Sequence, residues 1–131
     1  MIDDFILASK AYAMNSKELC DRTMEFALRI LRLADALPRT VAGRTIAAQI
    51  AKSGISVAAN YRAALRGKSR ADFVNKITIV LEEADETAFW LELIERSELP
   101  PADRLSPLRA EGSELVRIFN ATRSTARNRK S

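Results

Sequence analysis

The sequence predicts an all-α protein, an antiparallel up-down-up-down four-helix bundle with a short N-terminal extension. The chain of 131 residues has only four glycines and four prolines, whereas the good helix formers Ala, Leu, Glu and Arg are abundant. Along four segments, apolar residues recur at alternating steps of four and three, the spacing of a helical core face. Short connections join these segments, and short connections make successive helices antiparallel neighbours.

The N-terminal end carries an extension before the first predicted helix. Its apolar residues suit either a short packing segment or a disordered arm, and they are Ile2, Phe5, Ile6, Tyr12 and Met14. We assign residues 1–14 to this extension, residues 15–126 to the bundle domain and residues 127–131 to a basic C-terminal tail.

The first bundle helix is expected from Asn15 to Leu37. Asn15 followed by Glu18 has the spacing of a capping box, in which each side chain bonds the backbone N–H of the other residue. The predicted core face consists of Leu19, Thr23, Phe26, Ile30, Leu33 and Leu37.

The second helix is expected from about Val41 to Arg66. Its predicted core face includes two polar residues and consists of Ile46, Ile50, Ser53, Val57, Asn60 and Ala64. Gly67 is expected to end this helix as a left-handed cap, because glycine adopts positive φ at no steric cost. Ser69 is the expected N-cap of the next helix.

The third helix is the longest, and its expected end is at Pro100 and Pro101. Its core face is Phe73, Ile77, Val80, Ala84, Thr87, Leu91 and Ile94. The core face of the fourth helix is Leu105, Leu108, Gly112, Leu115 and Phe119. Either Pro101 or Pro107 suits the first turn of the fourth helix, and we prefer Ser106 as N-cap with Pro107 as the first helical residue.

The acidic N-terminal residues and the single cysteine favour a cytoplasmic location. Asp3 and Asp4 stand where a secretory signal would carry basic residues. Cys20 is the only cysteine, so no internal disulfide can form. Because no charge-free apolar run reaches the length of a membrane span, we expect a soluble protein with no membrane partner.

The chain contains no histidine, which removes the commonest general base and the usual zinc and iron ligand. Acidic residues cluster on the third helix, but a di-iron bundle needs a Glu-x-x-His pair on each of two helices. Lys52 and Ser53 are adjacent on a helix and therefore do not face each other as a catalytic dyad. We therefore predict a non-enzymatic protein with no catalytic, cofactor-binding or metal-binding residues.

Several polar residues lie on or beside the predicted core faces of the second and third helices. They are Gln49, Ser53, Ser56, Asn60, Lys76 and Glu83. A buried polar group without a partner costs about 1 to 3 kcal/mol, so these residues are expected to pair with one another. We interpret them as a buried hydrogen-bond network that fixes the helix register, with a ligand site as the alternative. An enzyme built on Asn60, Lys76 and Glu83 is the least favoured hypothesis.

Basic residues are segregated to one face of the second helix and the connection that follows it. On a helical wheel four of them fall within an arc of about 80° opposite the core face. With two from the connection, they form the predicted nucleic-acid-binding set Arg44, Lys52, Arg62, Arg66, Lys68 and Arg70. A basic surface on a protein with a pI near 9.6 is typical of phosphate-backbone binding, and the alternatives are a solvated face or a subunit contact.

More apolar surface is present than one bundle can bury. On the third helix Ile79, Phe89, Trp90 and Leu93 lie away from the core face, among Glu82 and Glu86. A second apolar stripe on a bundle helix indicates another partner, and we prefer self-association, with acidic third helices meeting basic second helices in a ring.

Three stretches of the sequence resemble a known family. Residues 46–62 read IAAQIAKSGISVAANYR, residues 69–73 read SRADF, and residues 83–91 read EADETAFWL. Their order and spacing resemble the bacterial four-helix bundle proteins first noticed as products of intervening sequences in large-subunit ribosomal RNA genes. The resemblance spans about Ser16 to Arg127.

The resemblance implies a homopentameric ring of four-helix bundles. Related bundle proteins are accessory factors for the reverse transcriptases of diversity-generating retroelements, so it also implies nucleic acid and a reverse transcriptase as partners. This sequence has Ala63 where the family commonly has Glu, and Glu82 where it often has Lys. We therefore predict a non-enzymatic pentamer that binds RNA or DNA through its basic surface. The alternative is a protein-interaction or scaffolding module whose basic residues serve subunit contacts.

Overall fold

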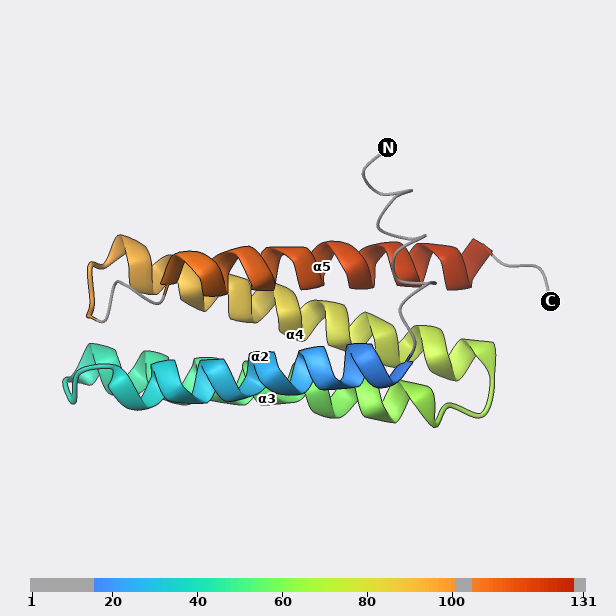
Figure 1. The fold of residues 1–131 in the computed structure, drawn as a ribbon, viewed down its shortest axis with the longest axis horizontal. Helices are drawn as coiled ribbons and strands as arrows, with labels where there is room; N and C mark the ends of the chain where they lie inside the picture. The colour runs from blue at the N-terminus through green and yellow to red at the C-terminus, as the bar shows by residue number, and fades with distance from the viewer. Residues whose placement is uncertain (1–15, 101–104, 129–131) are drawn as a thin grey trace.

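The computed structural model describes residues 16–100 and 105–128, which form four α-helices without any strand among them. The helices are α2 (Ser16–Ala36), α3 (Val41–Leu65), α4 (Arg70–Arg96) and α5 (Leu105–Asn128). Figure 1 shows them aligned along one axis with alternating direction, so each helix is antiparallel to the next. The predicted four-helix bundle is confirmed. The expected extension, residues 1–14, and the cap at Asn15 lie outside the described residues.

Side-chain caps define the N-termini of α3 and α4. The Ser69 hydroxyl accepts a hydrogen bond from the Asp72 backbone N–H at 3.1 Å, which confirms the predicted cap of α4. The Thr40 hydroxyl accepts one from the Gly43 N–H, also at 3.1 Å, and so caps α3. The connections before these two helices are short, residues 37–40 and 66–69, as the antiparallel arrangement requires.

Three expected helix ends were wrong. No glycine among the described residues has positive φ, so Gly67 is not a left-handed cap. Instead the Arg66 N–H donates to the Ala63 carbonyl and the Gly67 N–H donates to the Ala64 carbonyl, each at 3.1 Å, which tightens the last turn of α3. Helix α4 ends at Arg96, ahead of the prolines, because the chain turns at Glu98, whose φ is 59°.

The third wrong end is the start of the last helix. Helix α5 begins at Leu105, so Ser106 lies inside it rather than capping it. Pro107 is then the third helical residue, where a missing N–H costs nothing because first-turn N–H groups have no intrahelical acceptor. At its other end α5 continues to Asn128, so Arg127 belongs to the helix and not to a tail.

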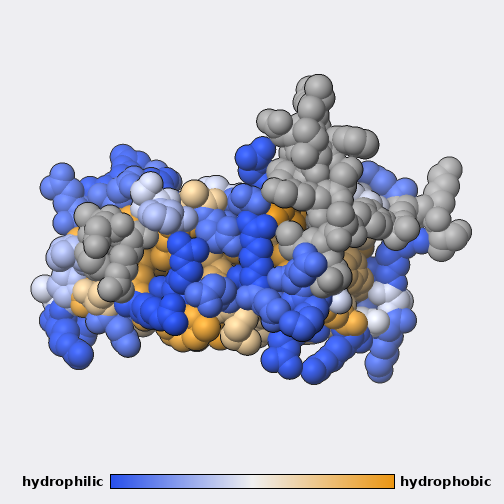
Figure 2. All heavy atoms as spheres, viewed as in Figure 1, coloured by the Kyte–Doolittle hydropathy of each residue, from blue (hydrophilic) through white to orange (hydrophobic). Residues whose placement is uncertain are grey.

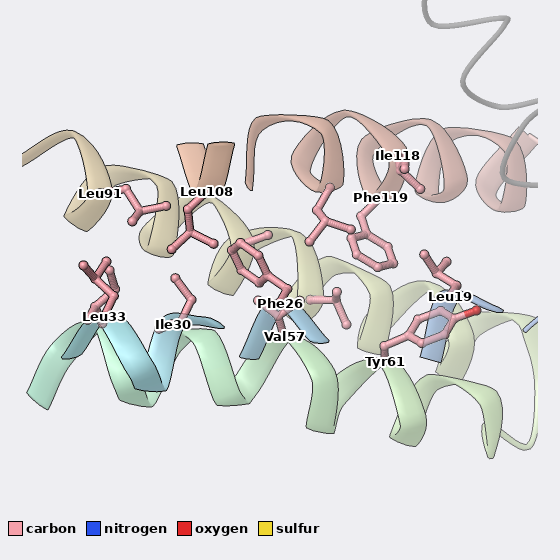
Figure 3. Packing of buried hydrophobic residues seen from close by; sticks show 14 of the residues in the cluster. Leu19, Phe26, Ile30, Leu33, Val57, Tyr61, Leu91, Leu108, Ile118 and Phe119 are labelled. Carbon is pink, nitrogen blue, oxygen red and sulfur yellow. The ribbon is translucent and has the colours of Figure 1, made fainter. Parts of the chain in front are cut away.

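The core faces of all four helices meet in one hydrophobic cluster. Figure 3 shows Phe26, Val57 and Phe119 among the side chains that fill the space between the helices. Gly54 lets α2 approach α3 closely, since a Cβ at this position would lie 2.8 Å from the Ile30 Cγ2. No described helix is long and apolar enough to cross a membrane.

Candidate nucleic-acid interface

The basic surface comprises Arg44, Lys52, Arg62, Arg66, Lys68 and Arg70, and all six residues are exposed. The core face of α3 orients the surface: Ile50 and Val57 are fully buried, which turns the opposite side of the helix outward. Lys68 and Arg70 continue the surface through the connection into the first residue of α4. All six predicted cations are therefore open to solvent within the single chain.

Several ion pairs between side chains of the described residues lie outside the basic surface. They join Lys17 to Asp21, Arg22 to Glu111 and Glu114, Arg32 to Glu25, Arg96 to Glu92, and Arg109 to Glu95. Arg44 donates a hydrogen bond to the Arg39 backbone carbonyl at 3.2 Å. The positive charge of Lys52 partly opposes the rise in the pKa of the Glu83 carboxyl. In the connection after α3, the Asp72 carboxylate accepts a hydrogen bond from the Lys68 backbone N–H at 3.2 Å, so the positive charge of the basic surface is partly offset there.

The basic surface contains apolar residues but no exposed aromatic ring. Val41 and Ile55 are exposed on the same side of α3, at 77% and 45% of their full surface. Tyr61, the one aromatic residue nearby in the sequence, is buried against Phe119, with 5.5 Å between ring centroids. Burial raises the pKa of its hydroxyl to about 12. Because Tyr61 is buried, its ring is not available to stack on a ligand.

Only part of the predicted polar network is buried. The hydroxyls of Ser53 on α3 and Thr87 on α4 lie 2.8 Å apart, and both residues are almost fully buried. Each hydroxyl also reaches a carbonyl of its own helix, that of Ile50 at 3.3 Å and that of Glu83 at 2.8 Å. This arrangement satisfies both polar groups and links the two helices in one register.

The other predicted members of the network lie nearer the surface. The Asn60 amide donates to the Ser56 hydroxyl at 2.8 Å, so this half-buried pair stays within α3. Gln49 and Lys76 are exposed in the chain and do not join the buried pair, since their long side chains reach water from the edge of the core. Burial raises the pKa of the half-buried Glu83 carboxyl, and the charge of Glu86 adds to the effect.

Sequence reasoning missed Thr87 as the partner of Ser53. The signal was present, because both residues occupy core positions and carry hydroxyls that need a partner. The expected partner was instead sought among polar residues at the edges of the core. Among the described residues, no group of acidic or cysteine side chains is arranged to hold a metal ion.

A second exposed surface lies on α4. Phe89 and Leu93 are exposed at 55% and 36%, and Phe89 packs edge-on against Trp90 with 5.0 Å between ring centroids. The Trp90 indole donates to the Glu86 carboxylate at 3.3 Å, which fixes this acid beside the aromatic pair. The predicted apolar excess on this helix is therefore present as a surface of mixed apolar and acidic character.

A third apolar surface was not predicted. On α2, Met24, Leu28 and Leu31 are exposed at 44%, 39% and 38%. Figure 2 shows apolar surface among charged side chains in the lower half of the view, where α2 and α3 lie. The steps of four and three between these residues gave the signal in the sequence.

Most of the chain matches one known protein family. The model of the 23S rRNA-intervening sequence protein family matches residues 15–121. The chain belongs to this family. The matched residues include the whole of α2, α3 and α4 and most of α5.

A solved structure supports the membership of the 23S rRNA-intervening sequence protein family. It is a protein of unknown function from the S23 ribosomal protein family of Bacteroides thetaiotaomicron, 36% identical in sequence. The match covers 79% of this chain and 95% of that chain, with a TM-score of 0.72. Among curated proteins, none matches the chain.

Proposed function

We propose that the protein is a non-enzymatic, homopentameric bundle protein that binds the backbone of RNA or DNA through its basic surface. The observation that supports this most strongly is the exposure of six cations along α3 and the turn after it. Lys and Arg side chains arranged along one face neutralise phosphates and release counterions, so binding is expected to be strong at low salt and weakly sequence-specific.

The remaining features are consistent with this function. The family takes its name from sequences that interrupt 23S rRNA, which makes an RNA the first ligand to examine. The absence of histidine from the chain disfavours the commonest acid–base and metal-dependent mechanisms. A reverse transcriptase or another protein is the further partner implied by the family resemblance.

Titration with labelled single-stranded and duplex RNA at about 50 mM and 200 mM salt tests the proposal. We expect binding that weakens steeply with salt. In Arg44→Ala/Lys52→Ala, the slope of log K against log salt should fall by about two, one for each lost phosphate contact. The matched control is Arg32→Ala/Arg96→Ala, which removes two cations that are already paired with carboxylates. No binding by the wild type at low salt would reject the proposal.

A scaffolding module is the second candidate. Val41 and Ile55 are exposed within the basic side of α3, and apolar groups are poor neighbours for phosphates but good ones for protein. On this hypothesis the cations of α3 meet carboxylates of another subunit, and RNA has no access to them.

A further inference from the structure

The outer sides of α3 and α4 carry matching patterns of charge and size. On α3, four exposed residues follow steps of four, three and four, namely Ile55, Ala59, Arg62 and Arg66. On α4, four exposed residues follow the same steps, namely Glu82, Glu86, Phe89 and Leu93. At about 100° per residue, each set falls within an arc of about 60°. Each helix therefore presents one seam of the kind that packs against another helix.

We propose that a second copy of this chain lays its α4 seam antiparallel on the α3 seam. This inference rests on the self-association proposed above and assigns the residues that produce it. The seams then match at every position, as the pairs Arg66 with Glu82, Arg62 with Glu86, Ala59 with Phe89, and Ile55 with Leu93. Two ion pairs form at one end, a large ring covers a small methyl group, and two aliphatic side chains meet at the other end.

The direction of the contact follows from the two patterns. In a parallel arrangement with Arg62 opposite Glu82, Phe89 would lie opposite Ser69, beyond the end of α3 at Leu65. In the antiparallel arrangement three of the four α3 positions lie within the helix, and the fourth, Arg66, is its C-cap. In antiparallel coiled coils an a position meets a d position at each level, and the shared steps of four, three and four place the two seams in that relation.

The α4 seam is held ready for such a contact. Phe89 packs against Trp90, and Trp90 in turn donates to Glu86, so the aromatic ring and the carboxylate are positioned before a partner arrives. Ordering these side chains in advance lowers the entropy lost on association. The exposed fractions of Ile55, Phe89 and Leu93, 45%, 55% and 36%, leave apolar area for a partner to cover.

The contact ends where the charges stop matching. One position further along, Lys52 would lie opposite Arg96, whose guanidinium is 3.3 Å from Glu92 of its own helix. The basic surface is thereby divided. Arg62 and Arg66 serve assembly, whereas Arg44 and Lys52 remain for phosphate.

The same contact sets the symmetry of the assembly. Because α3 and α4 are antiparallel within one chain, an antiparallel α3–α4 contact between copies makes their bundles parallel. Parallel copies are related by a rotation axis along the helices, and repeating the contact about that axis closes a ring. Each copy then uses its α3 for one neighbour and its α4 for the other when the ring has more than two members.

Charge reversal tests the pairing. In light scattering after size exclusion, Arg62→Glu/Arg66→Glu and Glu82→Arg/Glu86→Arg should each reduce the mass of the wild-type assembly to that of one chain. The quadruple variant, with all four charges exchanged, should recover the wild-type mass, since both seams are complementary again. A mixture of the two double variants should form mixed assemblies but no closed ring of five, because the two variants must alternate and alternation needs an even number of subunits. Circular dichroism verifies that each variant remains helical.

The control is Arg39→Glu/Arg44→Glu, which changes the net charge by the same amount outside the seam and should keep the wild-type mass. A monomeric wild type, an unchanged mass in the double variants, or no recovery in the quadruple variant would overturn the inference. RNA titration of Arg44→Ala/Lys52→Ala separates this result from the proposed function. Unchanged RNA binding and salt dependence in this variant, with the assembly intact, would reject only the nucleic-acid role of Arg44 and Lys52.

Discussion

At the scale of single residues, the contact between Ser53 and Thr87 is the one hydrogen bond between side chains that crosses the described core. The two hydroxyls lie 2.8 Å apart, and the residues are 1% and 0% exposed. A hydroxyl at this depth costs about 1 to 3 kcal/mol if it loses its partner, whereas replacing both partners by apolar groups is close to neutral. The pair therefore contributes to helix register more than to total stability.

This argument predicts a strongly coupled pair of substitutions. Thr87→Val should lower the free energy of unfolding by about 1 to 2 kcal/mol, because the Ser53 hydroxyl keeps only a 3.3 Å contact with the Ile50 carbonyl. Ser53→Ala/Thr87→Val should cost less than the two single changes together. Urea unfolding at one fixed protein concentration, analysed as a double-mutant cycle, measures the coupling. Additive effects would show that the hydroxyls do not act as a pair.

At the scale of helices, local sequence determined some ends and tertiary structure determined others. Ser69 was predicted correctly because a cap is a local contact, here with the Asp72 N–H. The left-handed cap at Gly67 was predicted wrongly, because the N–H groups of Arg66 and Gly67 satisfy the carbonyls of Ala63 and Ala64 without positive φ. The basic surface was predictable because a helical wheel separates the outer from the core side. The partner of Ser53 was not, because it depends on how α4 is rotated against α3.

The closeness of α2 and α3 gives a prediction at the same scale. A Cβ on Gly54 would lie 2.8 Å from the Ile30 Cγ2, so Gly54→Ala should force the helices apart and destabilise the bundle by about 1 to 3 kcal/mol. Gly112→Ala is the matched control, since a Cβ there meets nothing nearer than 3.6 Å and should gain about 0.5 to 1 kcal/mol of helix propensity. Thermal unfolding of both variants compares them directly. A Gly54→Ala variant that is as stable as the wild type would contradict the packing argument.

At the scale of the whole molecule, the first and last helices must close the bundle. Arg22 on α2 donates to both carboxylate oxygens of Glu111 on α5, at 2.7 and 2.8 Å, and its guanidinium lies 2.8 Å from Glu114. The hydrogen bonds to Glu111 chiefly hold the pKa of Arg22 above its ordinary value, against the opposing effect of burial. Two acids on one face of α5 are thus tolerated because one cation lies between them.

Removing that cation should weaken the closure of the bundle. In Arg22→Ala, Glu111 and Glu114 lie beside each other on one partly buried face of α5 and lose the cation between them, so we expect a loss of about 1.5 to 3 kcal/mol in the free energy of unfolding. Arg32→Ala breaks only an exposed pair with Glu25, 3.7 Å apart, and should cost less than about 1 kcal/mol. Hydrogen exchange locates the effect: amides of α5 should lose protection in Arg22→Ala while those of α3 keep it. The α3 surface would then stay intact, and RNA binding and assembly should persist in a bundle whose closing helix is loosened. Equal losses of stability in the two variants would mean that the Arg22 bridge to α5 contributes no more than an exposed ion pair.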